Sequence, residues 1–258
     1  MSSIMQKGFR RRQVNRWLLL LVIASLVLCS LVLVSHNLPG PRIPLARARS
    51  TIIKIMPLGD SITYGVGAST KGGYRLPLWN ALKARGFSFH FVGSVKTGPS
   101  GFDQQNEGHP GWEINQIAAK VVNWLKTYRP NMILLHIGTN DFVKNYYPAQ
   151  ASTRLSHLLD LITTTLPGST VIVAQIIPIP RNARLISEVT AYNAAIPGIV
   201  RADVARGKHV QYVDMYHVVP PNGMLPDQIH PNDIGYFQMA NVWLRALLPL
   251  LSQEASRR

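Results

Sequence analysis

A serine that could act as a nucleophile follows the first apolar segment after residue 50. The sequence PLGDSIT (57–63), which contains Ser61, comes directly after the apolar run 52–56, and we expect this run to be a buried β-strand. Open α/β sheets build their sites in the loops that follow their strands. A serine hydroxyl attacks a carbonyl only when a nearby base accepts its proton. Ser61 is therefore a candidate nucleophile for acyl transfer, and it requires a base.

Two Asp-x-x-His segments could supply this base together with the carboxylate that orients it. In a turn, a carboxylate three residues before a histidine can reach Nδ1 of the imidazole and leave Nε2 free for a serine. Asp227 and His230 precede the sequence PND, which resembles a capped helix start. Asp214 and His217 have the same spacing but follow the last expected strand, and apolar neighbours favour partial burial of His217. Spacing does not choose between the pairs, whereas the motif context favours Asp227 and His230.

Acyl transfer also needs hydrogen-bond donors that stabilise the negatively charged tetrahedral intermediate. We expect three donors to form this oxyanion hole: the backbone N–H of Ser61, the backbone N–H of Gly111 in EGHPGW (107–112) and the side-chain amide of Asn140 in GTND (138–141). Taken singly, Gly111 could be an ordinary turn glycine, as we expect for Gly108, and Asn140 a helix cap. The occurrence of all the candidates in order along the chain favours the oxyanion hole.

Other residues near these blocks could contact substrate or stabilise the fold. Asp60, Tyr74 and Trp112 are candidate substrate-binding residues, and Trp112 would narrow the acyl pocket beside Gly111. The glycine-containing segment 65–72 matches neither GxGxxG nor GxxxxGK[ST], so we expect a flexible active-site loop. We expect structural roles for His136 and His157, and the chain contains neither HExxH nor the GxSxG elbow of α/β-hydrolases. No metal or other cofactor is expected.

The elements that must position these residues follow from an alternation of short apolar runs and longer amphipathic stretches. We expect strands near 52–57, 88–93, 131–137, 170–177 and 209–213, and helices near 74–85, 114–128, 152–166, 186–204 and 233–250. This order predicts a three-layer α/β/α domain with a five-stranded parallel sheet and right-handed crossovers. The loops after its strands meet at one edge. Such loops hold all the main candidates, Ser61, Gly111, Asn140, Asp227 and His230.

The N-terminal residues have a different composition from the domain, which we expect to occupy 51–258. Residues 18–34 form an uncharged run of 17 apolar and small residues, roughly 26 Å long as a helix, close to the thickness of a bilayer core. A basic tail (1–17) precedes this hydrophobic helix, and a linker with three prolines (35–50) follows it. We favour an uncleaved signal-anchor with a cytoplasmic tail and an extracytoplasmic domain, because no small-x-small cleavage site follows closely. The alternative is a cleaved signal peptide and a secreted enzyme.

The composition excludes two classes of protein. With 47% hydrophobic and 15% charged residues, the chain is too apolar for a disordered protein. The formal charge of +15 is concentrated at the N-terminus, where residues 1–50 hold eight Lys/Arg and no acidic residue. The remaining net charge of +7 contains no basic run and no nucleic-acid-binding motif, so nucleic acid is not an expected partner. The only cysteine, Cys29, lies in the apolar run, which excludes a disulfide within the domain.

Four sequence blocks together resemble a known family over most of residues 51–250. They are GDSI with Ser61, the glycine block ending at Gly111, GTND with Asn140, and DQIH with Asp227 and His230. In this order they resemble the SGNH subgroup of the GDSL esterase superfamily. The strings GDSITYG, GGYR, EGHPGW and DQIHPNDIGY are most similar to carbohydrate esterases of the acetylxylan esterase type. The resemblance implies a flavodoxin-like domain that removes acetyl groups from sugars.

The leading hypothesis is a carboxylic ester hydrolase that cleaves acetyl esters of carbohydrate through an acyl-enzyme. Its partners are then acetylated carbohydrate or another ester and, if the N-terminus is uncleaved, the membrane. One alternative keeps the reaction but makes the protein a membrane-tethered lipid or lysophospholipid esterase, or a general short-chain esterase. A second alternative is a non-catalytic carbohydrate-binding protein, in which the sugar-stacking aromatic residues would be Tyr64, Tyr74, Trp112, Tyr146 and Tyr147.

Overall fold

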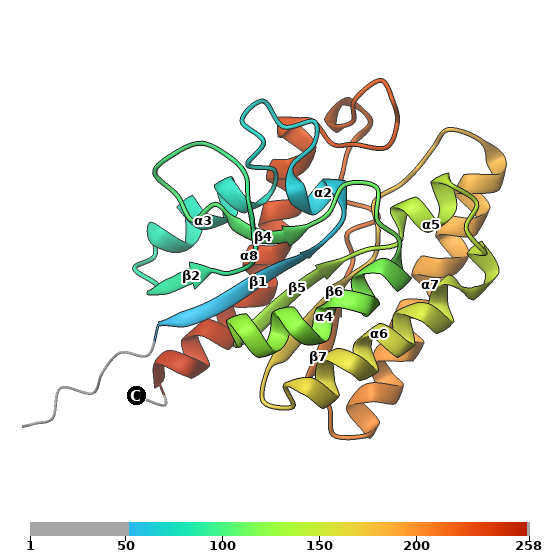
Figure 1. Ribbon diagram of the computed structural model, residues 1–258. Helices are drawn as coiled ribbons and strands as arrows, with labels where there is room; N and C mark the ends of the chain where they lie inside the picture. Colours follow the sequence, from blue (N-terminus) through green and yellow to red (C-terminus); the bar gives the residue numbers. More distant parts are fainter. Residues whose placement is uncertain (1–51, 257–258) are drawn as a thin grey trace, which may run out of the picture. The chain divides into compact units, whose positions relative to one another are not determined.

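A mostly parallel β-sheet forms the middle layer of residues 52–256, the part of the chain that the computed structural model describes (Figure 1). Its strands are β1 (Ile53–Gly59), β2 (Phe89–Phe91), β3 (Val95–Lys96), β4 (Gln105–Gly108), β5 (Met132–His136), β6 (Thr170–Ala174) and β7 (Val210–Val213). The predicted N-terminal tail, hydrophobic helix and linker (1–50) lie outside the described residues.

The strand order of the sheet is β3-β4-β1-β5-β6-β7, and β2 also pairs with β1. The five predicted strands are present and lie parallel in the order β2-β1-β5-β6-β7, which is the strand order of flavodoxin-like sheets. Two short strands were not predicted: β4 is parallel to the end of β1, and β3 is antiparallel to β4. The β4 sequence QNEG has no apolar alternation, so nothing in its pattern indicates a strand.

Helices cover both faces of the sheet. The long helices are close to the predicted ones: α3 (Arg75–Lys83), α4 (Ile114–Tyr128), α6 (Ala151–Thr165), α7 (Ala183–Ala205) and α8 (Asp233–Ser256). Short helical turns that were not predicted are α2 (Ser61–Tyr64), α5 (Thr139–Val143) and the 3₁₀ turns η1 (Pro148–Gln150) and η2 (Pro221–Gly223). In Figure 1, α2 lies beyond the end of β1 and α5 beyond the end of β5.

Two apolar clusters join these layers. One packs α4, α6 and α7 against the sheet and includes Met56 and Leu58 of β1. The other packs α3 and α8 against the opposite face and includes Ile53 and Ile55 of β1. Each large aliphatic side chain buried in this way stabilises the fold by about 1.5–3 kcal/mol. The α/β/α layering therefore follows from strands that are apolar on both faces.

The strand order also fixes where a site can form. β1 and β5 are neighbours in register from Ile55 and Met132 to Gly59 and His136. The chain leaves β1 toward β2 and leaves β5 toward β6, so the connections diverge on opposite sides of this pair. Open α/β sheets bind ligands at such a switch point, beyond the carboxyl ends of the strands. Ser61 and Asn140 follow these two strand ends.

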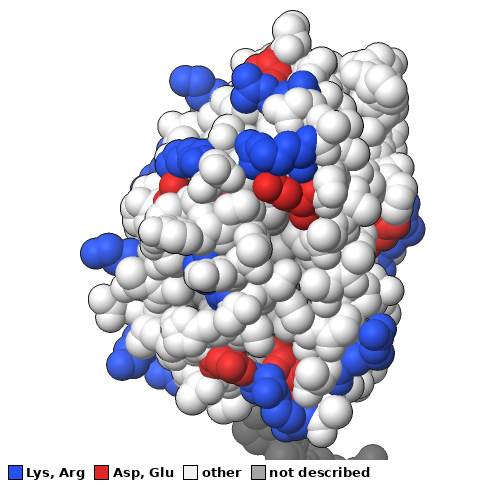
Figure 2. Space-filling view, turned by 90° about the vertical axis from the view of Figure 1, so that its right-hand side faces the viewer, with Lys and Arg blue, Asp and Glu red and all other residues white. Residues whose placement is uncertain are grey.

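The surface of the described domain carries charges of both signs. Figure 2 shows the side of the domain that lies to the right in Figure 1, where Lys/Arg and Asp/Glu side chains are interspersed among uncharged residues. This face contains no continuous basic stripe, which is the arrangement that nucleic-acid binding requires. Among residues 52–256, no helix combines the length and the apolar character needed to cross a membrane.

Candidate active site

Ser61 is the first residue of α2, a single helical turn directly after β1. The Asp60 side chain caps this turn by accepting a hydrogen bond from the Ile62 N–H at 3.0 Å. At its other end, the N–H groups of Gly65 and Val66 both donate to the Ser61 carbonyl at 3.0 Å. These bonds hold the backbone of Ser61 from both sides at the carboxyl end of β1.

A hydrogen-bonded chain links Ser61 to a histidine and an aspartate. The Ser61 Oγ lies 3.0 Å from Nε2 of His230, and Nδ1 of His230 lies 2.6 Å from Oδ2 of Asp227. Partial burial alone would raise the pKa of Asp227, but hydrogen bonds from His230 and Ile229 hold it below the usual value. The carboxylate is therefore ionised at neutral pH and is placed to orient and stabilise a protonated imidazole.

The loop that carries His230 is closed by its own backbone. The Leu225 N–H donates to the His230 carbonyl at 2.8 Å, and the Gln228 N–H donates to the Leu225 carbonyl at 2.9 Å. Asn232 then caps α8 by accepting from the Ile234 N–H at 2.9 Å. The helix start that the sequence PND indicates is therefore present, and it holds the end of the loop that carries His230.

Asp214 and His217 form the same local pair at a different place. Nδ1 of His217 lies 2.8 Å from Asp214, whose other oxygen accepts the His217 N–H at 3.1 Å. The expected partial burial of His217 is wrong, because 72% of its side chain is exposed. The hydrogen bond to Ser61 is made by His230. The two pairs therefore differ in position and not in local geometry.

Gly111 occupies a turn that requires glycine. The Trp112 N–H donates to the His109 carbonyl at 3.1 Å, and Gly111 has a φ of +83°. Pro110 followed by a residue with positive φ fits a type II turn, in which glycine is favoured at the third position. The His109 N–H donates to the carbonyl of Gly59 at 3.0 Å and fixes this turn to the end of β1. The turn is thereby attached next to Ser61.

Aromatic stacking supports the same turn. The His109 ring contacts both Trp112 and Trp124, with centroid distances of 4.3 and 4.7 Å, and its Nε2 lies 2.9 Å from the buried Glu107 carboxylate. Gly108 was expected to be an ordinary turn glycine, and this is wrong. It ends β4, and a Cβ there would lie 2.3 Å from the Tyr64 nitrogen. Glycine is needed for close packing of β4 against α2.

Asn140 lies on α5, and its amide reaches the glycine turn. Nδ2 of Asn140 donates to the Trp112 carbonyl at 2.9 Å, which leaves the second N–H of the amide. The neighbouring Asp141 accepts from the Ile114 N–H at 3.1 Å and pairs with Arg154 at 2.6 Å. These bonds tie α5 to both α4 and α6. The three expected oxyanion donors thus follow the neighbouring strands β1, β4 and β5.

Of the three expected substrate-binding residues, two are buried. Asp60 is completely buried, and burial raises its pKa to about 6. Tyr74 is also completely buried, packs against Trp243 at a ring distance of 5.8 Å and meets the Thr63 hydroxyl at 3.3 Å. The prediction that these two residues contact substrate is therefore wrong. Trp112 is partly exposed and remains a candidate.

Arg75 is a structural residue of the site that we did not predict. Its buried guanidinium donates to the Thr97 hydroxyl and to five backbone carbonyls, those of Thr63, Tyr64, Lys71, Thr97 and Gln104. Burial lowers its pKa to about 10, so it is still charged at neutral pH. The carbonyls of Thr63 and Tyr64 belong to α2, so Arg75 holds the turn that presents the serine. The GGYR string marks the position, but its spacing does not indicate carbonyl binding.

The segment 65–72 borders the site but is more restrained than its glycines indicate. The Ser69 N–H donates to Asp233 at 3.0 Å, and the Tyr236 hydroxyl donates to the Val66 carbonyl at 2.5 Å. Both bonds tie the segment to α8.

His136 is buried in β5 with a pKa lowered to about 4 by burial, so it is neutral. Within residues 52–256, no three His, Cys, Asp or Glu side chains gather in a way that could hold a metal ion.

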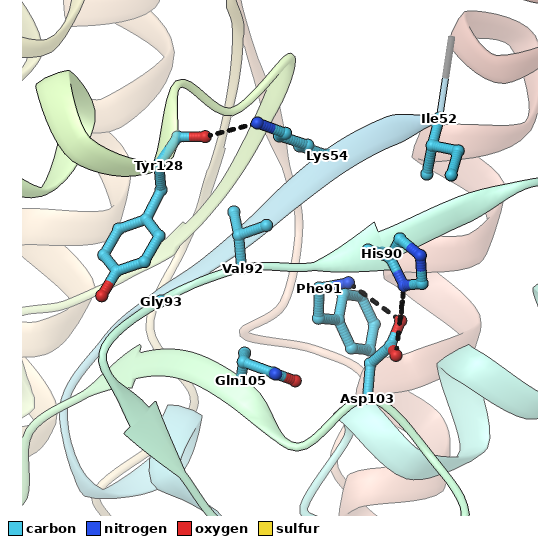
Figure 3. Close-up of a pocket in the computed structure, with 9 residues that line it drawn as sticks. All are labelled: Ile52, Lys54, His90, Phe91, Val92, Gly93, Asp103, Gln105 and Tyr128. Carbon is cyan, nitrogen blue, oxygen red and sulfur yellow. Dashed lines mark hydrogen bonds and ion pairs between the residues drawn. The ribbon is translucent and has the colours of Figure 1, made fainter. Parts of the chain in front are cut away.

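A cavity of about 440 Å³ is lined by residues from the start of β1, from β2 and from the end of α4 (Figure 3). Asp103 pairs there with His90 at 3.1 Å and accepts the Phe91 N–H at 3.2 Å, while Lys54 donates to the Tyr128 carbonyl at 3.3 Å. These bonds satisfy the outer edge of β2 and the end of α4, which is a structural role. Four other cavities of the described domain likewise have neither Ser61 nor His230 in their walls.

Comparison with known proteins adds to this geometry. Residues 58–237 match the model of the GDSL-like Lipase/Acylhydrolase family. A multidomain esterase of Ruminococcus flavefaciens is 30% identical over 239 residues, which cover 80% of this chain. The matched region spans only 30% of that esterase.

Two solved structures are similar over the described domain. A family 3 carbohydrate esterase of Clostridium thermocellum has a TM-score of 0.72 and 39% identity, covering 78% of this chain and 98% of that one. An acetyl esterase mutant with an acetate ion has a TM-score of 0.68 and 26% identity, covering 78% and 99%.

Proposed function

The chain belongs to the GDSL-like lipase/acylhydrolase family of ester hydrolases, and we propose that it removes acetyl groups from carbohydrate by a Ser-His-Asp mechanism. The observation that carries this proposal is the hydrogen-bonded chain from Ser61 through His230 to Asp227, with distances of 3.0 and 2.6 Å. Family membership also argues against a non-catalytic carbohydrate-binding protein.

In the acylation step, Ser61 Oγ forms a bond to the ester carbonyl carbon while its proton passes to Nε2 of His230. Asp227 stays ionised and stabilises the imidazolium that results. The tetrahedral intermediate then collapses, the bond to the sugar oxygen breaks, and His230 gives its proton to that oxygen. The sugar hydroxyl leaves, and the acetyl group remains on Ser61.

The negative charge of the intermediate falls on the former carbonyl oxygen. We assign its stabilisation to the N–H of Ser61, the N–H of Gly111 and the second N–H of the Asn140 amide. Removal of one such donor typically lowers kcat on the order of 10²–10³-fold. The donors are held by the α2 turn, the type II turn and α5, so they need no rearrangement when charge develops.

Deacylation repeats the same proton transfers with water. His230 takes a proton from a water molecule, whose oxygen attacks the acyl-enzyme carbonyl, and then returns the proton to Ser61 Oγ. Acetate leaves, and the free serine is restored. The cycle consumes one water molecule for each ester that is cleaved.

The names of similar solved structures support a short acyl group on a carbohydrate. These structures are a family 3 carbohydrate esterase and an acetyl esterase. Trp112 beside the Gly111 turn is suited to close one side of a small acetyl site.

The acyl length tests this proposal against a lipid esterase. The full chain, purified in detergent, is assayed with p-nitrophenyl acetate, p-nitrophenyl palmitate and acetylated xylan, with the Ser61→Ala variant as the blank. We expect hydrolysis of the acetate ester, release of acetate from xylan and little turnover of palmitate. Activity on palmitate without acetate release from xylan would support the lipid alternative instead.

The expected extracytoplasmic location remains a proposal that rests on residues 1–34. Five basic residues precede the apolar run, which favours a cytoplasmic N-terminus and an external domain. A polysaccharide substrate outside the cell fits that orientation. N-terminal sequencing of the exported protein distinguishes the anchor, which retains the apolar run, from a cleaved signal peptide.

A further inference from the structure

Lys144, the C-cap residue of α5, contacts the glycine turn. Its ammonium donates to the Gly111 carbonyl at 2.5 Å and pairs with the Glu113 carboxylate at 2.7 Å. An ammonium has three N–H donors; one of them binds the turn and a second binds the residue that caps α4. The Glu113 side chain is only 10% exposed, and that of Lys144 is 47% exposed. None of the four sequence blocks contains Lys144.

Asn140 and Lys144 act from the same side of α5. Residues four apart lie on one face of a helical turn, and the Lys144 N–H donates to the Asn140 carbonyl at 3.0 Å. The Asn140 amide holds the Trp112 carbonyl, while the Lys144 ammonium holds the preceding one, that of Gly111. Two successive carbonyls of the glycine turn are therefore bound to a single face of α5.

This attachment joins two segments that each carry an assigned oxyanion donor. The Gly111 carbonyl belongs to the peptide whose N–H, on Trp112, closes the type II turn at 3.1 Å. A cation on that carbonyl polarises the peptide and strengthens the closing bond. The Lys144 Nζ also lies 3.9 Å from where a Gly111 Cβ would be, and no other atom outside the adjacent residues comes within 4 Å of that position. The ammonium thus borders the exposed face of the turn.

We propose that Lys144 is a positioning residue of the oxyanion hole. It fixes the Gly111 turn to α5, so that the Gly111 N–H and the Asn140 amide keep one separation, and its positive charge favours the anionic intermediate. This inference rests on the proposed function, because the oxyanion hole is assigned there. It adds a residue outside the four blocks to the machinery that stabilises the intermediate.

A plain ion pair between α5 and α4 is the rival role for Lys144. A pair that only joins two helices contributes to the stability of the fold, and its loss leaves the kinetics unchanged. Loss of a positioning residue lowers kcat while KM stays constant, because the interaction matters only in the transition state. Affinity for phenylboronic acid, which forms a tetrahedral adduct with a catalytic serine, reports on the same geometry without turnover.

The experiment compares four variants of the full chain on p-nitrophenyl acetate. Lys144→Met removes donor and charge, and Lys144→Gln keeps a donor. Glu113→Gln removes the charge that pairs with Lys144 and keeps an amide oxygen for the capping bond to the α4 backbone. Lys120→Met removes an exposed lysine of α4 as a control. We expect Lys144→Met to lose about tenfold in kcat, or about 1.4 kcal/mol, and a similar factor in phenylboronic acid affinity, with unchanged KM. Lys144→Gln should lose less, and Glu113→Gln and Lys120→Met should stay close to the parent.

Two outcomes overturn the inference. One is a Lys144→Met variant with the parent's kcat and phenylboronic acid affinity. The other is a Glu113→Gln variant that loses as much as Lys144→Met, because the ion pair would then matter more than the Gly111 contact. Thermal unfolding of each variant, with assays well below its transition, excludes loss of folded protein as the cause. Ser61→Ala is assayed alongside, and if it stays active the proposed function fails, not the Lys144 inference alone.

Discussion

One carboxylate fixes both the ring and the backbone of the histidine that faces the serine: Asp227 Oδ2 lies 2.6 Å from His230 Nδ1, and Asp227 Oδ1 accepts the His230 N–H at 3.0 Å. The same double contact joins Asp214 and His217, where the distances are 2.8 and 3.1 Å. The chain therefore contains two copies of one local structure, and only the His230 copy is hydrogen-bonded to Ser61.

These two copies provide a matched pair of variants. His230→Ala removes the base and should lower kcat for p-nitrophenyl acetate by at least about 10³-fold. His217→Ala removes an exposed imidazole in the same local geometry, so kcat should stay within twofold of the parent. The kcat of both purified variants is measured at one pH. Loss of turnover in His217→Ala alone would overturn the assignment of the base.

Gly111→Ala tests the type II turn. Alanine at a φ of +83° costs about 1–2 kcal/mol, and relief of this strain moves the N–H that we assign to the oxyanion hole. We expect kcat to fall more than about tenfold and the stability to fall by the strain energy. Gly86→Ala is the control, because Gly86 has a φ of +78° and nothing within 4 Å of the added Cβ. It should lose similar stability and keep the parent's kcat.

Arg75→Lys tests whether the buried guanidinium supports the serine turn. Lysine has three donors and cannot reproduce bonds to five carbonyls, so several buried carbonyls lose their partners at roughly 1–3 kcal/mol each. We expect the free energy of unfolding in urea to fall by at least 2 kcal/mol, on the order of one or two such bonds, and kcat to fall with it. Arg85→Lys is the control, since Arg85 is exposed and binds only the Ala81 carbonyl. Equal stabilities of the two variants would contradict this role.

Asp60→Asn tests the buried acid behind the serine. The folded-state pKa of Asp60 is raised to about 6 from 3.8 by burial, so the folded protein binds more protons than the unfolded chain between these values. The contribution of Asp60 to the free energy of unfolding is favourable below pH 4 and is lost as the pH rises through 6. Asparagine keeps the cap on Ile62 without the charge, so the variant's stability relative to the parent should rise by about 2–3 kcal/mol from pH 4 to pH 7. Urea unfolding at both pH values measures this, and a constant difference would contradict it.

The sequence predicted those parts of the fold that have a regular apolar pattern. The helix over 114–128 was predicted with its observed bounds because Ile114, Ile117, Val121 and Leu125 follow one buried face. The turns α2 and α5 were missed because helices of four and five residues are too short to show a period. β4 was missed because QNEG is polar and pairs only through its backbone.

In the candidate site, too, the residues that lie in a recognisable sequence pattern were predicted and the others were missed. Ser61, Gly111, Asn140, Asp227 and His230 lie in characteristic blocks and were predicted from them. Arg75 and Lys144 act on backbone carbonyls that are distant in the sequence, and no spacing of residue types indicates such contacts. The burial of Tyr74 was missed because its packing on Trp243 joins residues 169 positions apart.

The central claim is that Ser61 forms the acyl-enzyme, and Ser61→Ala tests it most directly. The kcat/KM of the full chain for p-nitrophenyl acetate is measured for the parent and the variant, in which His230 and Asp227 are intact. We predict a fall of at least about 10⁴-fold. The rate that remains comes from the direct attack of water, which only the oxyanion hole still assists. A Ser61→Ala variant with the parent's kcat/KM would contradict the claim.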